Sequence, residues 1–246
     1  MKNDARRFAN SSHMDEQIKR YQALDDWFSS ALGVNLGQAL ADKFIEIQDM
    51  LSGSILLQLG ACGGVFPPSP TFTYKWVASP NLTPHTHLLT NMHHLPLERE
   101  SVDCILAPFT MEAFFGDPNI LDEMDRILTP MGTIVFFDIN PFSFWGAWLR
   151  CSPKTCFGKD KSRGISLWSL KRAMVHRGYS TYYYSNFYHT PPINCQKIIK
   201  KMQFVNKIPP VCLPFPSGFT CYVVQKYQQK LLPLPKIALI PQLIVT

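Results

Sequence analysis

Apolar residues recur at helical spacing over the first fifty positions of the chain. Between residues 14 and 31 they stand three and four positions apart, and a second stripe runs from Leu36 to Leu51, just before Gly53. The pattern predicts two amphipathic helices. We expect residues 1–53 to form a helical segment that packs on the rest of the chain.

From residue 54 onward, short apolar runs alternate with helical patterns. Residues 55–59 form an apolar run directly before a cluster of glycines, as in a buried parallel strand. Further strands are expected at residues 73–78, 86–90, 102–106, 133–138, 179–187 and 219–225. Helices are expected at residues 117–128, capped by Asp117 with Pro118 in the first turn, and at residues 167–176.

This alternation predicts an α/β fold with a mainly parallel sheet over residues 54–226. Residues 227–246 are apolar but interrupted by prolines, so we expect an extended tail. The aromatic run at residues 142–148 is read first as an apolar helix packed on the sheet, and second as the floor of a substrate pocket.

Composition narrows the class of protein. Aromatic residues make up 13% and charged residues 17%, which excludes an intrinsically disordered chain. No uninterrupted apolar run of about 18 residues predicts a membrane span, and the first residues lack the apolar run of a secretory signal. The seven cysteines include no Cys-x-x-Cys pair, so we expect reduced thiols and no metal site. A cytoplasmic monomer is therefore expected.

Charge is divided unevenly along the chain. Residues 1–160 hold 12 basic and 18 acidic residues, whereas residues 161–246 hold 12 basic and no acidic residue. One interpretation is that the C-terminal part meets a negatively charged partner, either an acidic acceptor or RNA. The other is that these basic side chains pair with acids of the first part within the fold.

The glycine cluster after the first predicted strand is the first candidate for a ligand-binding site. Gly60, Ala61, Cys62, Gly63 and Gly64 directly follow the predicted first strand. Parallel sheets bind ligands at the carboxyl ends of central strands, and glycines let the backbone turn sharply and approach a ligand closely. Alone, such a turn is equally explained by tight packing.

Three further segments extend the pattern. They are Asn-Met-His-His-Leu-Pro-Leu at 91–97, Ser-Val-Asp-Cys-Ile-Leu-Ala-Pro-Phe at 101–109, and Leu-Asp-Glu-Met-Asp-Arg-Ile-Leu-Thr-Pro-Met-Gly at 121–132. In this order, residues 25–226 resemble the class I S-adenosylmethionine-dependent methyltransferases of the type 11-like group. The resemblance implies a Rossmann-like seven-stranded sheet in the order 3-2-1-4-5-7-6, with helices on both faces and a final antiparallel strand.

The resemblance also implies a set of contacts with S-adenosylmethionine. The resemblance implies that Asn91 and Met92 contact the adenine and that Pro108 and Phe109 lie near the transferable methyl group. It implies that the methionine part of the cofactor is lined by Gly60, Ala61, Cys62 and Gly63. Ser79 stands where the family usually carries an acidic residue that binds the ribose hydroxyls. Three prolines between residues 65 and 72 interrupt the helix that usually follows the glycine loop.

A base is needed only where the methyl acceptor carries a proton at neutral pH. The candidates are Glu112, Asp138 and His189, although helix-end or turn-capping roles explain the two acids as well. We therefore expect an S-adenosylmethionine-dependent methyltransferase whose acceptor is acidic or phosphate-bearing. The alternatives are a catalytically degenerate binding protein on the same fold, and a nucleic-acid or membrane-surface binding protein with a basic face.

Overall fold

The computed structural model describes residues 2–64, 71–114, 117–153, 155–158, 166–193 and 216–227, with side chains from residue 14 onward. The three prolines between residues 65 and 72 and nearly all of the predicted tail lie outside these ranges. So do several of the C-terminal basic residues, namely Lys161, Arg163, Lys197, Lys200, Lys201, Lys207, Lys230 and Lys236.

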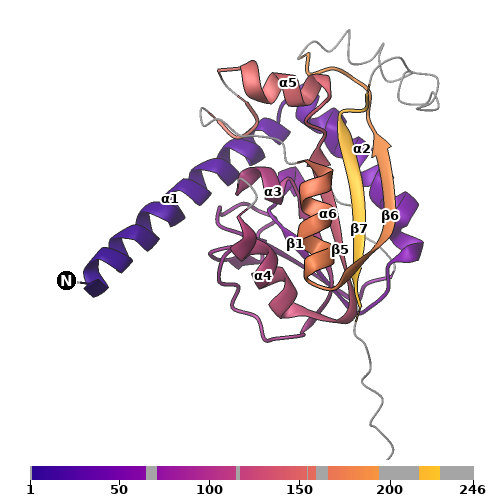
Figure 1. The fold of residues 1–246 in the computed structure, drawn as a ribbon. Helices are drawn as coiled ribbons and strands as arrows, with labels where there is room; N and C mark the ends of the chain where they lie inside the picture. The colour runs from indigo at the N-terminus through magenta and orange to yellow at the C-terminus, as the bar shows by residue number, and fades with distance from the viewer. Residues whose placement is uncertain are drawn as a thin grey trace, which may run out of the picture.

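Two helices precede the first strand, four strands follow without an α-helix between them in the described residues, and helices and strands then alternate as far as the last two strands (Figure 1). The strands are β1 (Ile55–Leu59), β2 (Tyr74–Ser79), β3 (Leu88–Leu89), β4 (Val102–Pro108), β5 (Leu128–Ile139), β6 (Tyr179–Phe187) and β7 (Phe219–Lys226). The α-helices are α1 (Lys2–Phe28), α2 (Ala31–Ile47), α3 (Thr110–Ala113), α4 (Pro118–Ile127), α5 (Phe144–Cys151) and α6 (Leu167–His176). The 3-10 turns are η1 (Gln48–Met50) and η2 (Cys62–Gly64).

The strands form one sheet in the order β3-β2-β1-β4-β5-β7-β6, which confirms the predicted topology. β7 runs antiparallel to both of its neighbours, and the other pairings are parallel. The order reverses between β1 and β4, so the loop after β1 lies at the point where such sheets bind ligands.

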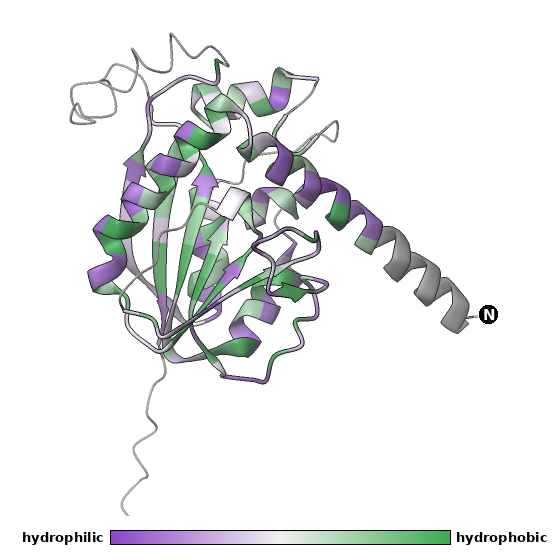
Figure 2. Cartoon of the chain, turned by 180° about the vertical axis from the view of Figure 1, so that it is seen from behind, coloured by the Kyte–Doolittle hydropathy of each residue, from purple (hydrophilic) through white to green (hydrophobic). Residues whose placement is uncertain are grey.

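Helices cover both faces of the sheet, with α4 and α6 on one face and α2 on the other (Figures 1 and 2). The apolar stripe of α2 faces inward, and Lys43 at its edge reaches Ser185 of β6 with Nζ–Oγ at 3.1 Å. The strands between these layers are mostly coloured as hydrophobic in Figure 2. Leu57, Leu106 and Phe136 are fully buried there.

Several elements differ from their predicted bounds. α1 begins at Lys2 rather than residue 14, and α2 spans Ala31–Ile47 rather than residues 36–51. β3 keeps only two residues, paired with the end of β2. β5 begins at Leu128 rather than residue 133. Its first part includes Met131, which has a left-handed φ of 63°, and the register to β4 shifts between Leu128 and Thr133.

The aromatic run forms α5, as the first of its two interpretations predicts. Ser143 caps this helix by accepting a hydrogen bond from the backbone of Gly146. Trp145 is fully buried, whereas Phe142 and Phe144 are exposed. In the described part of the chain, no helix is long and apolar enough to cross a bilayer.

Candidate functional site

The glycine loop after β1 is a tight turn with left-handed backbone. Gly60 has a φ of 90° and donates its backbone N–H to Ala78 at 2.7 Å, while Gly63 and Gly64 have φ near 70°. Gln58 holds the turn through its side-chain amide, which donates to the carbonyl of Gly60 at 2.7 Å. This conformation suits glycine because a Cβ is disfavoured there, and Cys62 shares it with a φ of 44°.

Helix α1 lies directly over this loop. A Cβ built on Gly60 would come within 2.5 Å of Cε1 in the ring of Tyr21. Ala61 and Cys62 are fully buried beneath the helix. Burial raises the pKa of the Cys62 thiol well above its usual value, and the nearby Asp25 carboxylate adds to the shift. Cys62 is therefore a neutral packing residue near neutral pH.

The end of β2 and the segment 91–97 form the next wall. The Ser79 hydroxyl is buried and accepts a hydrogen bond from the backbone N–H of Asn81 at 3.1 Å. Asn91 accepts from the backbone N–H of His93 at 2.9 Å, which closes a local turn. The backbone N–H of Met92 points to Gln17 of α1, with N–Oε1 at 3.4 Å.

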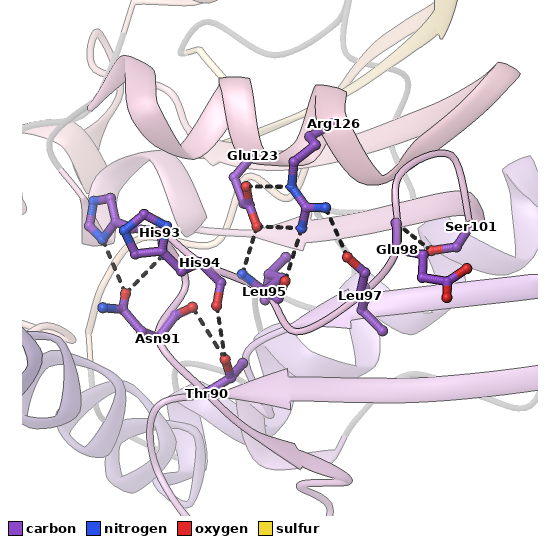
Figure 3. Close-up of polar contacts among 10 residues, drawn as sticks. All are labelled: Thr90, Asn91, His93, His94, Leu95, Leu97, Glu98, Ser101, Glu123 and Arg126. Atoms are coloured by element: carbon purple, nitrogen blue, oxygen red, sulfur yellow. Dashed lines mark hydrogen bonds and ion pairs between the residues drawn. The ribbon is translucent and has the colours of Figure 1, made fainter.

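Polar contacts at both ends fix segment 91–97 to its surroundings, and Figure 3 shows those made by Glu123 and Arg126. Arg126 of α4 donates to the carbonyls of Leu95 and Leu97 and pairs with Glu123 at 2.8 Å. At the other end of the segment, His93 Nε2 lies 2.9 Å from a carboxylate oxygen of Asp117. A polar cavity of about 630 Å³ lies between this segment and α4.

The chain reverses direction at the end of β4. Pro108 ends the strand, and Phe109 takes a left-handed φ of 53°, with its ring 6.0 Å from that of Phe28 in α1. This turn starts α3 and brings Glu112 back onto β5. There its carboxylate oxygen Oε1 accepts the backbone N–H of Ile139 at 2.6 Å.

Glu112 and Asp138 form a buried carboxyl pair. Burial raises the pKa of both groups, and the charge of Glu112 raises that of Asp138 further. The hydrogen bond between the two carboxyls requires a proton on one of them. We place this proton on Asp138, because the Ile139 amide stabilises the charged form of Glu112.

A smaller cavity of about 240 Å³ opens beside this pair, at the carboxyl end of β5. Asp138, Phe142, Trp168 and Tyr184 contribute to its lining. The third base candidate, His189, follows β6 and is nearly fully buried, which lowers its pKa. Of the three predicted base candidates, the structure brings together the two acids.

The sequence interpretation missed the contribution of α1. Gln17, Tyr21 and Asp25 stand four positions apart, so they share one face of the helix. They contact the 91–97 segment, the glycine loop and the end of β2 respectively. Their helical spacing was the available signal, but nothing in the sequence pairs that face with residues 39 to 75 positions away.

No cluster of three His, Cys, Asp or Glu side chains suited to a metal ion occurs among the described residues. Two buried polar atoms at the glycine loop lack a hydrogen-bond partner among those residues: Tyr21 Oη and Asp25 Oδ1. A polar ligand at this loop therefore fits the residues present.

Comparisons with known proteins agree with this geometry. Residues 72–136, from β2 to β5, match the family model of a methyltransferase domain. None of the curated proteins compared matches the chain in sequence.

Two solved structures share the fold at low sequence identity. A SAM-dependent methyltransferase from Thermotoga maritima, described as a possible histamine N-methyltransferase, is 18% identical with a TM-score of 0.58, over 87% of this chain and 99% of the other. The geranyl diphosphate C-methyltransferase of Streptomyces coelicolor, solved with S-adenosyl-L-homocysteine, is 12% identical with a TM-score of 0.52, over 76% and 78%. By its strand order and these neighbours, the chain has the fold of the class I S-adenosylmethionine-dependent methyltransferases, and its residues 72–136 match a methyltransferase domain.

Proposed function

We propose that the protein binds S-adenosylmethionine at the glycine loop and acts as a methyltransferase. The observation that carries the proposal is the left-handed turn at Gly60, at the carboxyl end of the central strand where the strand order reverses. The matched methyltransferase-domain segment, which includes β2, the 91–97 segment and β4, supports it.

The residues that would hold the cofactor come from four places along the carboxyl edge of the sheet. They are the glycine loop Gly60, Ala61, Cys62 and Gly63; Ser79 at the end of β2; Asn91 and Met92; and Pro108 and Phe109 at the end of β4. Bound S-adenosylmethionine would supply an activated methyl group on sulfur. The protein would contribute mainly position and orientation.

The acceptor pocket we propose is the cavity of about 240 Å³ beside Asp138. Its aromatic rim, Phe142, Trp168 and Tyr184, is suited to a flat or apolar body. The buried carboxyl pair at its base has a pKa raised by burial, so Glu112 with Asp138 can take up or release a proton near neutral pH.

The basic residues near this cavity indicate which charge the acceptor carries. Arg177 pairs with Asp122 and Lys226 with Asp125, so internal pairing accounts for two of the basic residues after position 160. Lys171 and Arg172 remain exposed on α6, next to Trp168. We therefore propose an acceptor bearing a carboxylate or phosphate. Faster S-adenosylhomocysteine formation with an uncharged analogue than with such an acceptor would contradict this choice.

Thermal unfolding with S-adenosylhomocysteine tests the proposed function. A ligand at about 100 times its dissociation constant stabilises the folded state by about 2.7 kcal/mol, which corresponds to a rise in Tm of about 5–10 °C for a chain of this size. Adenine at the same concentration is the control and should produce a much smaller rise. No rise with millimolar S-adenosylhomocysteine would contradict the proposal.

Two observations favour a second candidate function. Tyr21 covers Gly60. At the end of β2, Ser79 stands in place of a carboxylate, and its hydroxyl accepts a hydrogen bond from Asn81. A binding protein that keeps the methyltransferase fold without turnover would show the same features. It would give the thermal shift but form no S-adenosylhomocysteine from S-adenosylmethionine with any acceptor.

A further inference from the structure

Asp25 links α1 to the corner between the glycine loop and the end of β2. Its carboxylate oxygen Oδ2 accepts a hydrogen bond from the side-chain amide of Asn81 at 2.8 Å. Asn81 is itself fixed two residues beyond the strand, because its backbone N–H donates to the Ser79 hydroxyl at 3.1 Å. The carboxylate of α1 is therefore held at the end of β2 although β2 carries no acid there.

The second oxygen of Asp25 lacks a partner. Oδ1 is buried, and no hydrogen bond to it forms among the described residues. Burial raises the pKa of Asp25, and the Asn81 amide and the backbone amides of Gly63 and Cys62 offset part of that rise. Those two loop amides face the carboxylate, but neither completes a hydrogen bond to Oδ1.

A buried acceptor without a donor costs free energy that a suitable ligand can recover. The neighbouring Tyr21 hydroxyl is also buried without a partner among the described residues. Tyr21 and Asp25 stand four residues apart on the face of α1 that covers the loop, so both buried oxygens lie near the corner between the loop and the end of β2. A suitable ligand must bring hydrogen-bond donors to this corner.

We propose that Asp25 binds the ribose hydroxyls of the cofactor and so supplies, from α1, the carboxylate that β2 lacks. The inference rests on the proposed function, because it assumes that the cofactor binds at the glycine loop. A ribose offers two adjacent hydroxyl donors, and a carboxylate can accept from both. Ser79 offers only a single neutral oxygen there, which already accepts one hydrogen bond from Asn81, and it cannot accept from both ribose hydroxyls as a carboxylate can.

Calorimetry with two nucleosides tests this assignment. S-adenosylhomocysteine and 5′-methylthioadenosine share the ribose and the adenine, but only the first carries the amino acid. In Asp25→Asn, the dissociation constants of both ligands are expected to rise about 10- to 100-fold, the range for a hydrogen bond to a charged group. The matched control is Asp26→Asn at the next, exposed position, which should change neither constant more than about twofold.

A second variant covers the case in which Asp25→Asn fails to fold. Asn81→Ala removes the donor that orients the carboxylate, so both nucleosides are expected to bind about 3- to 10-fold more weakly. Thermal unfolding without ligand provides the readout of folding. Asp25→Asn should be at least as stable as the wild type, because it removes a buried charge.

The outcomes separate this inference from the proposed function. If the wild type binds neither nucleoside, both are overturned. If it binds both and Asp25→Asn binds them equally well or better, the inference alone is overturned, because the carboxylate then contributes nothing to binding. A loss confined to S-adenosylhomocysteine would also overturn it, because the carboxylate would then pair with the ammonium group of the amino acid.

Discussion

A Gly60→Val variant is expected to lose about 3 kcal/mol or more of unfolding free energy. The new side chain would have to adopt a φ of 90°, which costs about 1–3 kcal/mol for a residue with a Cβ. Its Cβ would also lie 2.5 Å from the ring of Tyr21, which is 1% exposed and packed beneath α1, and overpacking of this kind costs about 1–3 kcal/mol. Urea-induced unfolding measures the loss.

A variant of a second glycine separates the cost of backbone strain from the cost of the steric clash. Gly178 has a similar φ of 82°, but the nearest heavy atom to a Cβ there is the carbonyl oxygen of Tyr227 at 4.0 Å. Gly178→Ala should therefore lose only the strain term, about 1 kcal/mol, and Gly60→Ala should lose clearly more. Equal losses in the two alanine variants would contradict the close packing of Tyr21 on the glycine loop.

The carboxyl pair predicts an unusual dependence of stability on pH. Because burial raises the folded-state pKa values of Glu112 and Asp138, the folded protein binds more protons than the unfolded chain from about pH 4 upward. Stability from this pair is thus fully present at low pH and is lost as the pH rises through the folded-state values. This is the opposite of an acid whose charged form is stabilised by a salt bridge.

Asp138→Asn isolates this contribution. Asparagine can still donate to Glu112 but has no proton to lose. Relative to the wild type, its unfolding free energy should increase by about 1–3 kcal/mol between pH 5 and pH 8. Asp26→Asn, at an exposed position, is the control and should show no such trend. A constant difference between Asp138→Asn and the wild type across this range would show that the pair does not share a proton.

Local pattern and family resemblance predicted much of the fold. The apolar run 55–59 and the alternation after it fixed the strands, and α6 and β6 have the predicted bounds. Asp117 caps α4 as its type and position suggested, accepting from Asn119. These features depend on a few neighbouring residues, which is why sequence spacing is enough to identify them.

The candidate site was less predictable because it depends on contacts across long stretches of chain. Asp25 meets Asn81 56 positions later, and Gln17 meets Met92 75 positions later. The family pattern placed the ribose-binding residue at Ser79, and only the packing of α1 brings a carboxylate there. Glu112 and Asp138 were each named as bases, but their contact depends on the left-handed turn at Phe109.

Hydrogen–deuterium exchange with and without S-adenosylhomocysteine tests most directly that the cofactor binds beneath α1 at the glycine loop. We predict slower exchange in peptides that contain residues 60–64, residues 91–95 and the second half of α1, because the ligand would contact the loops and restrain the helix. Peptides from β6 should be unchanged. Protection confined to α6 and β6, or no protection at saturating ligand, would contradict the account.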